Sequence, residues 1–79
     1  MNTFVVCINN ESNPASLILG KVYPRLPDPP GESHGMIRVV DEDIDEADGY
    51  LYDADMFVPV ELPEDVQQLL LAKYQSAAV

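Results

Sequence analysis

Residues 36–53, which read MIRVVDEDIDEADGYLYD, are the segment on which the predicted fold chiefly depends. Its first five residues, Met36–Val40, are apolar apart from one arginine and rich in β-branched side chains, which favours a strand. Its last five residues, Gly49–Asp53, predict another strand with two tyrosines near its centre. The pair Asp48-Gly49 is typical of a hairpin turn, so we expect these strands to form a hairpin around an acidic segment.

Three more strands and one helix are predicted outside this stretch. The strands are Thr3–Ile8, Leu17–Leu26 and Phe57–Leu62. The second of them contains Pro24, which has no N–H to donate, so we expect an edge strand or a bulge at that residue. After Pro63 the apolar residues recur at helical spacing, which predicts a helix that continues to about Ser76.

Two connecting segments are predicted to be irregular. Asn9–Ser16 is rich in Asn, Ser and Pro, a composition that is typical of a loop. Pro27–Gly31 holds three prolines in five residues and predicts a stiff loop of polyproline character.

The length and the composition limit the class of protein. A chain of 79 residues can form one small domain and no second core. Its single cysteine, Cys7, cannot form an internal disulfide, and we expect it to be a small buried residue of the first strand. The chain begins without a basic and apolar leader and has no apolar run near about 18 residues. We therefore expect a cytoplasmic protein that does not enter a membrane.

The net charge of −10 is concentrated in one half of the chain. Residues 1–40 hold three acids and three bases, whereas residues 41–79 hold eleven acids and one base. Eight of these acids fall between Asp41 and Asp55. Nucleic acids and anionic membranes repel such a chain, so we expect it to bind neither directly and to suit a basic partner.

Short motifs along the chain resemble small SH3-like barrel proteins of bacteria and phages. The motifs are Gly20-Lys21-Val22-Tyr23, Ile37-Arg38-Val39-Val40-Asp41, Gly49-Tyr50-Leu51-Tyr52 and Phe57-Val58-Pro59-Val60, after a first strand that contains a cysteine. The resemblance implies a mainly β protein, with a small five-stranded antiparallel SH3-like barrel over residues 1–62. Residues 63–79 are expected to form a C-terminal α-helix packed on the barrel, so that the whole chain is one domain.

Motifs for catalysis and for strong metal binding are lacking in the sequence. Ser33 and His34 are neighbours whose side chains point apart in an extended segment, so they cannot act as nucleophile and base. One cysteine and one histidine cannot build a four-ligand zinc site. We therefore expect no enzyme, no cofactor and no specific metal site. A weak calcium or magnesium site at Asp43, Asp45 and Asp48 stays open as an alternative.

The acidic segment is the strongest functional signal. If residues 41–55 fold back as a hairpin about 25 Å long, their eight acids give one charge per about 3 Å. A single DNA strand carries one phosphate per about 3.4 Å. The segment could thus mimic a nucleic acid and occupy a basic groove of a partner. The residues expected to make this contact are Asp41, Glu42, Asp43, Asp45, Glu46, Asp48, Asp53 and Asp55.

In overall profile, a small acidic chain without catalytic motifs is similar to the anti-CRISPR proteins of phages. The similarity implies a phage-type inhibitor that acts in the host cytoplasm on a CRISPR effector or another nucleic-acid-binding protein. Two alternatives stay open. One is a peptide-binding SH3-like adaptor with a groove of Tyr23, Tyr50 and Tyr52, and the other is an acidic bacterial domain of housekeeping role. The sequence does not decide between monomer and dimer.

Overall fold

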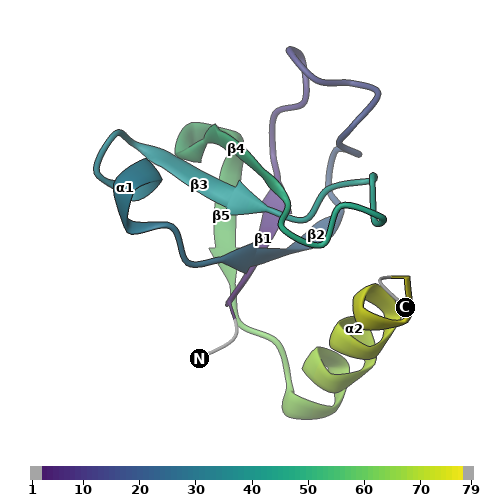
Figure 1. Cartoon of the computed structure of the whole chain (residues 1–79). Helices are drawn as coiled ribbons and strands as arrows, with labels where there is room; N and C mark the ends of the chain where they lie inside the picture. Colours follow the sequence, from purple (N-terminus) through teal and green to yellow (C-terminus); the bar gives the residue numbers. More distant parts are fainter. Residues whose placement is uncertain (1–2, 78–79) are drawn as a thin grey trace.

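A computed structural model describes residues 3–77 of the chain and is shown in Figure 1. Along these residues the elements are β1 (Thr3–Cys7), β2 (Val22–Leu26), α1 (Pro29–Glu32), β3 (Met36–Val39), β4 (Tyr50–Asp53), the 3-10 helix η1 (Ala54–Met56), β5 (Phe57–Val60) and α2 (Glu64–Ala77). The strands form one antiparallel sheet in the order β4-β3-β2-β1-β5. The predicted five-stranded antiparallel sheet and C-terminal helix are therefore confirmed.

The second strand is shorter than predicted and does not lie at an edge. It begins at Val22 rather than at Leu17, because Gly20 adopts a positive φ of 82° that interrupts the extended backbone. The expected edge position or bulge at Pro24 is wrong, since β2 lies between β1 and β3. The Val40 N–H donates to the Pro24 carbonyl at 3.0 Å, one residue beyond the β2–β3 ladder. Pro24 lies just past the end of the β2–β3 ladder, so the N–H that proline lacks is not needed for a hydrogen bond within that ladder.

A one-turn helix, α1, stands where a polyproline loop is expected, so that prediction is wrong. The Asp28 side chain caps the turn by accepting the Gly31 N–H at 3.0 Å. Pro29 and Pro30 take the first helical positions, where a missing N–H has no helical partner to lose. Arg38 Nε donates to the same Asp28 carboxylate at 2.8 Å, which ties α1 to β3.

The sheet is strongly curled. β4 and β5 lie at opposite edges of the strand order, yet only the three residues of η1 join them. A flat five-stranded sheet would separate its outer strands by about 19 Å. The chain from Asp53 to Phe57 spans at most about 15 Å, and less in a 3-10 turn. The sheet must therefore bend until its edges approach each other. Among the described residues no ladder joins β4 to β5, so closure into a barrel is not shown.

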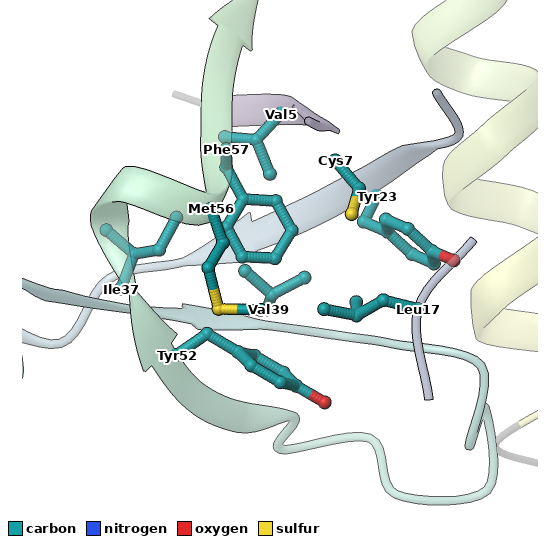
Figure 2. Close-up of a cluster of buried hydrophobic side chains, with 9 residues drawn as sticks. All are labelled: Val5, Cys7, Leu17, Tyr23, Ile37, Val39, Tyr52, Met56 and Phe57. Carbon is teal, nitrogen blue, oxygen red and sulfur yellow. The ribbon is translucent and has the colours of Figure 1, made fainter. Parts of the chain in front are cut away.

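One buried cluster lies inside this curl (Figure 2). Its members are Val5 and Cys7 of β1, Tyr23 of β2, Ile37 and Val39 of β3, Tyr52 of β4, Met56 of η1, Phe57 of β5, and Leu17 of the β1–β2 loop. Every strand contributes to the same core, as the curl requires. Tyr52 and Phe57 meet edge to face with ring centroids 5.8 Å apart, which links the two edge strands. The predicted burial of Cys7 is confirmed.

The helix α2 lies to one side of the sheet (Figure 1). The positive charge of Lys73 in this helix helps to lower the pKa of Glu42, after the larger effects of Lys21 and Tyr23. Val66 and Leu69 of its apolar stripe remain exposed. Phe4 is buried although it alternates with the core residues of β1, so part of the outer sheet face is covered. Packing of the helix on the sheet stays a prediction. The predicted barrel was to begin at residue 1 and the predicted helix to end at residue 79, and both of these residues lie outside the described part of the chain. None of the described helices is long and apolar enough to cross a membrane.

Candidate functional site

Three tyrosines hold the start of the loop between β3 and β4, residues 40–49, which we call the acidic loop. The hydroxyl donors and their carboxylate acceptors are Tyr23 and Glu42 at 2.5 Å, Tyr50 and Asp43 at 2.9 Å, and Tyr52 and Asp41. The Tyr23 and Tyr52 rings belong to the core, and their hydroxyl oxygens leave it on the same side (Figure 2). Three strand-borne hydroxyls thus bind three consecutive carboxylates, so the sheet fixes the backbone at the start of the loop.

Asp41 is the buried member of this group, with 2% of its surface exposed. Its Oδ2 accepts the Tyr52 hydroxyl, and its Oδ1 accepts the Asp43 N–H at 2.9 Å. Burial, together with the hydrogen bond to Asp41, raises the pKa of Tyr52 far above its ordinary value. The Tyr52 hydroxyl therefore stays protonated and keeps donating. Because Asp41 is enclosed and already bonded, the structure removes it from the expected partner contact.

Glu42 is half-buried between two donors. Lys21 Nζ, at 2.6 Å, and the Tyr23 hydroxyl both bind its Oε2. Burial by itself would raise the pKa of Glu42, but the hydrogen bonds from Lys21 and Tyr23, with the nearby lysine charges, lower it below the ordinary value. Glu42 is therefore ionised at neutral pH and paired within the chain, so it also contributes little free charge to the surface.

The other acids of the expected contact are exposed or half-exposed, and they fall into two groups. Asp43, Asp45, Glu46 and Asp48 belong to the acidic loop. Asp53 ends β4 and Asp55 lies in η1, so they sit about 10 Å or more along the strand from Tyr50. The structure thus brings four of the predicted residues together in one loop and places two at the far end of β4.

Three of the four bases form ion pairs with acids outside these two groups. The pairs are Lys21–Glu42 at 2.6 Å, Arg38–Asp28 at 2.8 Å and Arg25–Glu32 at 3.5 Å. Arg38 Nη1 also donates to the Asp48 and Gly49 carbonyls at 3.3 and 3.2 Å, so it binds the backbone of the loop rather than its carboxylates. The exposed acids are therefore not neutralised by these three bases.

The expected peptide groove of three tyrosines is not formed. Tyr23 is fully buried and Tyr52 is 7% exposed, because both rings fill the core. Tyr50 presents its ring, with 42% of the residue exposed. Burial of the two core rings follows from the curl of the sheet, which encloses one face of every strand.

A shallow groove does run along β4, beside the β1–β2 loop. One hollow of about 310 Å³ is lined by Tyr50–Tyr52, by Asp41 and Asp43, and by Asn13 and Ser16. A second hollow of about 180 Å³ is lined by Leu51–Asp53, by Met36 and Met56, and by Ser12 and Asn13. The two hollows share lining residues and therefore adjoin. We call them together the β4 groove.

Metal-ligating side chains do not gather in the described part of the chain. Within residues 3–77, no three His, Cys, Asp or Glu side chains are grouped in a way that could hold a metal ion. The alternative of a weak cation site at Asp43, Asp45 and Asp48 therefore finds no support in the described residues.

The tyrosine–carboxylate pairs are the feature that charge counting alone does not predict. A signal was present in the sequence for two of them. Asp41 and Asp43 alternate, as do Tyr50 and Tyr52 on the strand that returns beside them, and alternation along paired strands places such residues on one face. Tyr23 gives no comparable signal, because its position depends on the pairing of β2.

Comparisons with known proteins add no relative. No model of a protein family, no curated protein and no solved structure matches the chain. The functional conclusion therefore depends on the geometry of the acidic loop and of the β4 groove.

Proposed function

We propose that the chain is a non-catalytic binding protein whose acidic loop occupies a basic surface of a partner protein. The observation that carries the proposal is that some carboxylates of the loop anchor it to the core, whereas the others face solvent. Asp41 and Glu42 accept hydroxyls from the core and hold the backbone. The exposed or half-exposed carboxylates that follow, Asp43, Asp45, Glu46 and Asp48, are presented to solvent from that fixed base. Such a loop can pair with Lys and Arg side chains of a partner.

The acidic loop has internal hydrogen bonds that favour one shape before a partner arrives. The Glu46 N–H donates to the Asp43 carbonyl at 3.1 Å, and the Gly49 N–H donates to the Glu46 carbonyl at 3.0 Å. Gly49 has a φ of 67°, and a Cβ atom there would meet the Val39 carbonyl oxygen at 2.6 Å, so the loop needs glycine where it enters β4. A preformed loop loses less conformational freedom on binding, which favours affinity.

The sharper form of the proposal is competition with a nucleic acid. Clustered carboxylates would occupy the Lys and Arg side chains that otherwise bind phosphates. The partner class is then a CRISPR effector or another nucleic-acid-binding protein, and the role is that of a phage-type inhibitor. Electrostatic attraction would speed the association and would weaken as salt is added.

We also propose that the sheet belongs to the class of SH3-like barrels. The support is the curl that the short η1 connection imposes and the single core to which every strand contributes. The edge-to-face contact of Tyr52 with Phe57 brings the two edge strands together without a ladder. An experimental structure in which β4 and β5 lie far apart would contradict this assignment.

The test compares two triple variants that change the net charge equally. One carries Asp45→Asn, Glu46→Gln and Asp48→Asn, which remove three charges of the acidic loop without touching a tyrosine contact. The control carries Glu61→Gln, Glu64→Gln and Asp65→Asn, which remove three exposed charges elsewhere. Each protein is immobilised and exposed to a bacterial lysate at about 50 and about 500 mM salt. Captured proteins are then assayed for the release of labelled DNA or RNA as the chain is added.

We expect the wild-type chain and the control variant to capture a nucleic-acid-binding protein at low salt and to displace its nucleic acid. The loop variant should do neither. Equal capture by the loop variant and the control would contradict the role of the loop. Capture without displacement would contradict the competition, and capture that survives high salt would favour an adaptor that binds through apolar contacts.

A further inference from the structure

The outer edge of β4 carries backbone groups that face away from the sheet. The Ala54 N–H donates to the Gly35 carbonyl at 3.0 Å, across the β3–β4 ladder. In an antiparallel pair the backbone groups of successive residues face alternate sides. Tyr52, two residues earlier, therefore faces β3 as well, whereas Leu51 and Asp53 direct their backbone groups outward.

The pairing of β3 with β2 shows independently that the backbone groups of Leu51 face outward. The Val40 N–H donates to the Pro24 carbonyl, so Val40 faces β2. Val39, one residue earlier, then faces β4, where it lies opposite Tyr50. Tyr50 thus directs its backbone groups toward β3, and Leu51 again points outward.

These outward groups have no protein partner within residues 3–77. Nothing described there hydrogen-bonds to the Leu51 N–H, the Leu51 carbonyl or the Asp53 N–H, while the Asp53 carbonyl lies at the start of η1. An edge of this kind is a template for another strand. The β4 groove runs beside it, because Leu51 lines both hollows and Asp53 lines the second.

The opposite edge of the sheet, formed by β5, offers no free donor. The Ile8 N–H donates to the Met56 carbonyl at 2.9 Å, so Met56 faces β1 and Phe57 and Pro59 face outward. Pro59 has no N–H, and the Phe57 N–H already donates to the Ala54 carbonyl. Of the two edges, β4 is therefore the one prepared to receive a strand.

We infer that an extended basic segment of the partner protein lies in the β4 groove and joins the sheet as a sixth strand beside β4. The inference rests on the proposed function and names the part of the partner that is bound. Leu51 exchanges both of its backbone hydrogen bonds with one residue of the segment, and the Asp53 N–H donates to the carbonyl of another.

Charge complementarity identifies the segment as basic. Asp43 lines the groove near Tyr50 and Asp53 lines it at the other end of β4, about 10 Å further along. Asp43 lies on the face of the strand that Tyr50 shares with Tyr52, whereas Asp53 alternates to the other face. Two Lys or Arg residues three positions apart in an extended segment cover the same length and also point to opposite faces.

Other occupants fit less well. A second copy of the chain paired through Leu51 would place two negatively charged strands and their acidic loops side by side, and like charges repel. A neutral proline-rich segment lacks both the positive charge and, at proline, the N–H that the Leu51 carbonyl needs. Both become outcomes that the experiment can detect.

The probe is a synthetic peptide of about ten alternating Thr and Val residues, with two arginines three positions apart. Its binding to the full chain is measured by isothermal titration calorimetry at low salt. One control peptide replaces the arginines by glutamine, a second is proline-rich, and a third carries N-methyl groups on alternate amides so that one edge of its backbone cannot donate. We expect the arginine peptide to bind at least about tenfold more tightly than each control.

A matched pair of variants isolates the backbone contact. Asp53→Ala and Asp53→Pro both remove the carboxylate, but only proline also removes the outward N–H. Asp53 has a φ of −59°, which proline adopts without strain, and its N–H makes no bond within the sheet. Both variants should therefore melt at similar temperatures. We expect Asp53→Pro to bind the arginine peptide about fivefold more weakly than Asp53→Ala does.

Equal affinities of the two variants, or no binding of the arginine peptide to the wild-type chain, would overturn the strand-pairing inference. Tighter binding of the proline-rich peptide, or self-association in place of binding, would overturn it as well. The proposed function is tested separately, by the two triple variants described above.

Amide hydrogen exchange adds a second readout. The peptide should slow the exchange of the Leu51 and Asp53 amides at least about tenfold and leave the Tyr52 amide, already bound to β3, unchanged.

Discussion

The acidic loop contains two triplets of the same composition, and the fold uses them differently. The first triplet, Asp41, Glu42 and Asp43, accepts the three tyrosine hydroxyls described above. The second triplet, Asp45, Glu46 and Asp48, accepts none of those three. Both carry the same formal charge. The first triplet directly follows β3 and so lies over the rim of the core, where tyrosine hydroxyls need acceptors. The neighbours of a carboxylate, rather than its charge, therefore decide whether it supports the fold or stays available to a partner.

The largest expected effect comes from Asp41. Replacement by alanine leaves the buried Tyr52 hydroxyl and the Asp43 N–H without their acceptor, so Asp41→Ala should lower the free energy of unfolding by about 3 kcal/mol. Urea denaturation measures this loss. Asp45→Ala, the matched control in the second triplet, should change stability by no more than about 0.5 kcal/mol. Similar losses of stability in the two variants would contradict the different roles assigned to the two triplets.

The charge of Glu42 gives the next effect. Glu42→Gln loses the ion pair with Lys21 and should lower the free energy of unfolding by about 1 kcal/mol at neutral pH. The folded protein lowers the pKa of Glu42 below its ordinary 4.5, so its contribution is complete above that pH and is lost as pH falls through the folded pKa. The stabilities of wild type and variant should therefore converge in acid. If the difference in free energy of unfolding between wild type and variant stayed constant down to low pH, ionised Glu42 would not be the source of that stability.

Tyr50 tests the outermost of the three tyrosine contacts. The hydrogen bond to Asp43 raises the pKa of Tyr50, so Asp43→Asn should bring the ultraviolet titration of this tyrosine back toward its ordinary value of 10.0. Because both partners are exposed, Tyr50→Phe should lower the melting temperature less than Tyr52→Phe, which strips a buried acceptor of its donor. The reverse order in circular dichroism melts would refute the ranking by burial.

The smallest effect is expected from the second triplet and has the opposite sign. Asp45→Asn with Asp48→Asn relieves repulsion among neighbouring carboxylates, so the free energy of unfolding should rise by up to about 0.5 kcal/mol at low salt. The gain should shrink at about 500 mM salt, where exposed charges are screened. Destabilisation at low salt would mean that these residues also support the fold.

The strands and the helix could be predicted from the sequence because their signals are local. The β-branched run of Met36–Val39 and the helical spacing after Pro63 each depend on a few neighbouring residues. The short helix α1 was not predictable from its proline content, since its start depends on how the Asp28 side chain folds back onto Gly31. The central position of Pro24 depends on the order of the strands, which local composition does not contain.

The acidic loop could be located from the sequence, but the roles of its residues could not. Counting acids cannot separate Asp41 from Asp45, because the difference is the distance of each from Tyr52 in the folded sheet. The free edge of β4 is likewise invisible until the β3–β4 register shows which way the backbone of Leu51 faces. Such features depend on pairing between distant segments, and composition carries no record of pairing.

The buried position of Cys7 makes its thiol a probe of how often the folded molecule opens. This residue is the single cysteine of the chain, it is fully buried, and its strand lies between β2 and β5. A thiol reagent in solution can reach the sulfur only after part of the structure that covers it has opened. When reclosing is fast, the labelling rate reports the population of open molecules, and with excess reagent it approaches the opening rate itself. The effect of each carboxylate on stability can thus be measured without denaturant, from the rate at which the one thiol of each molecule is labelled in native buffer.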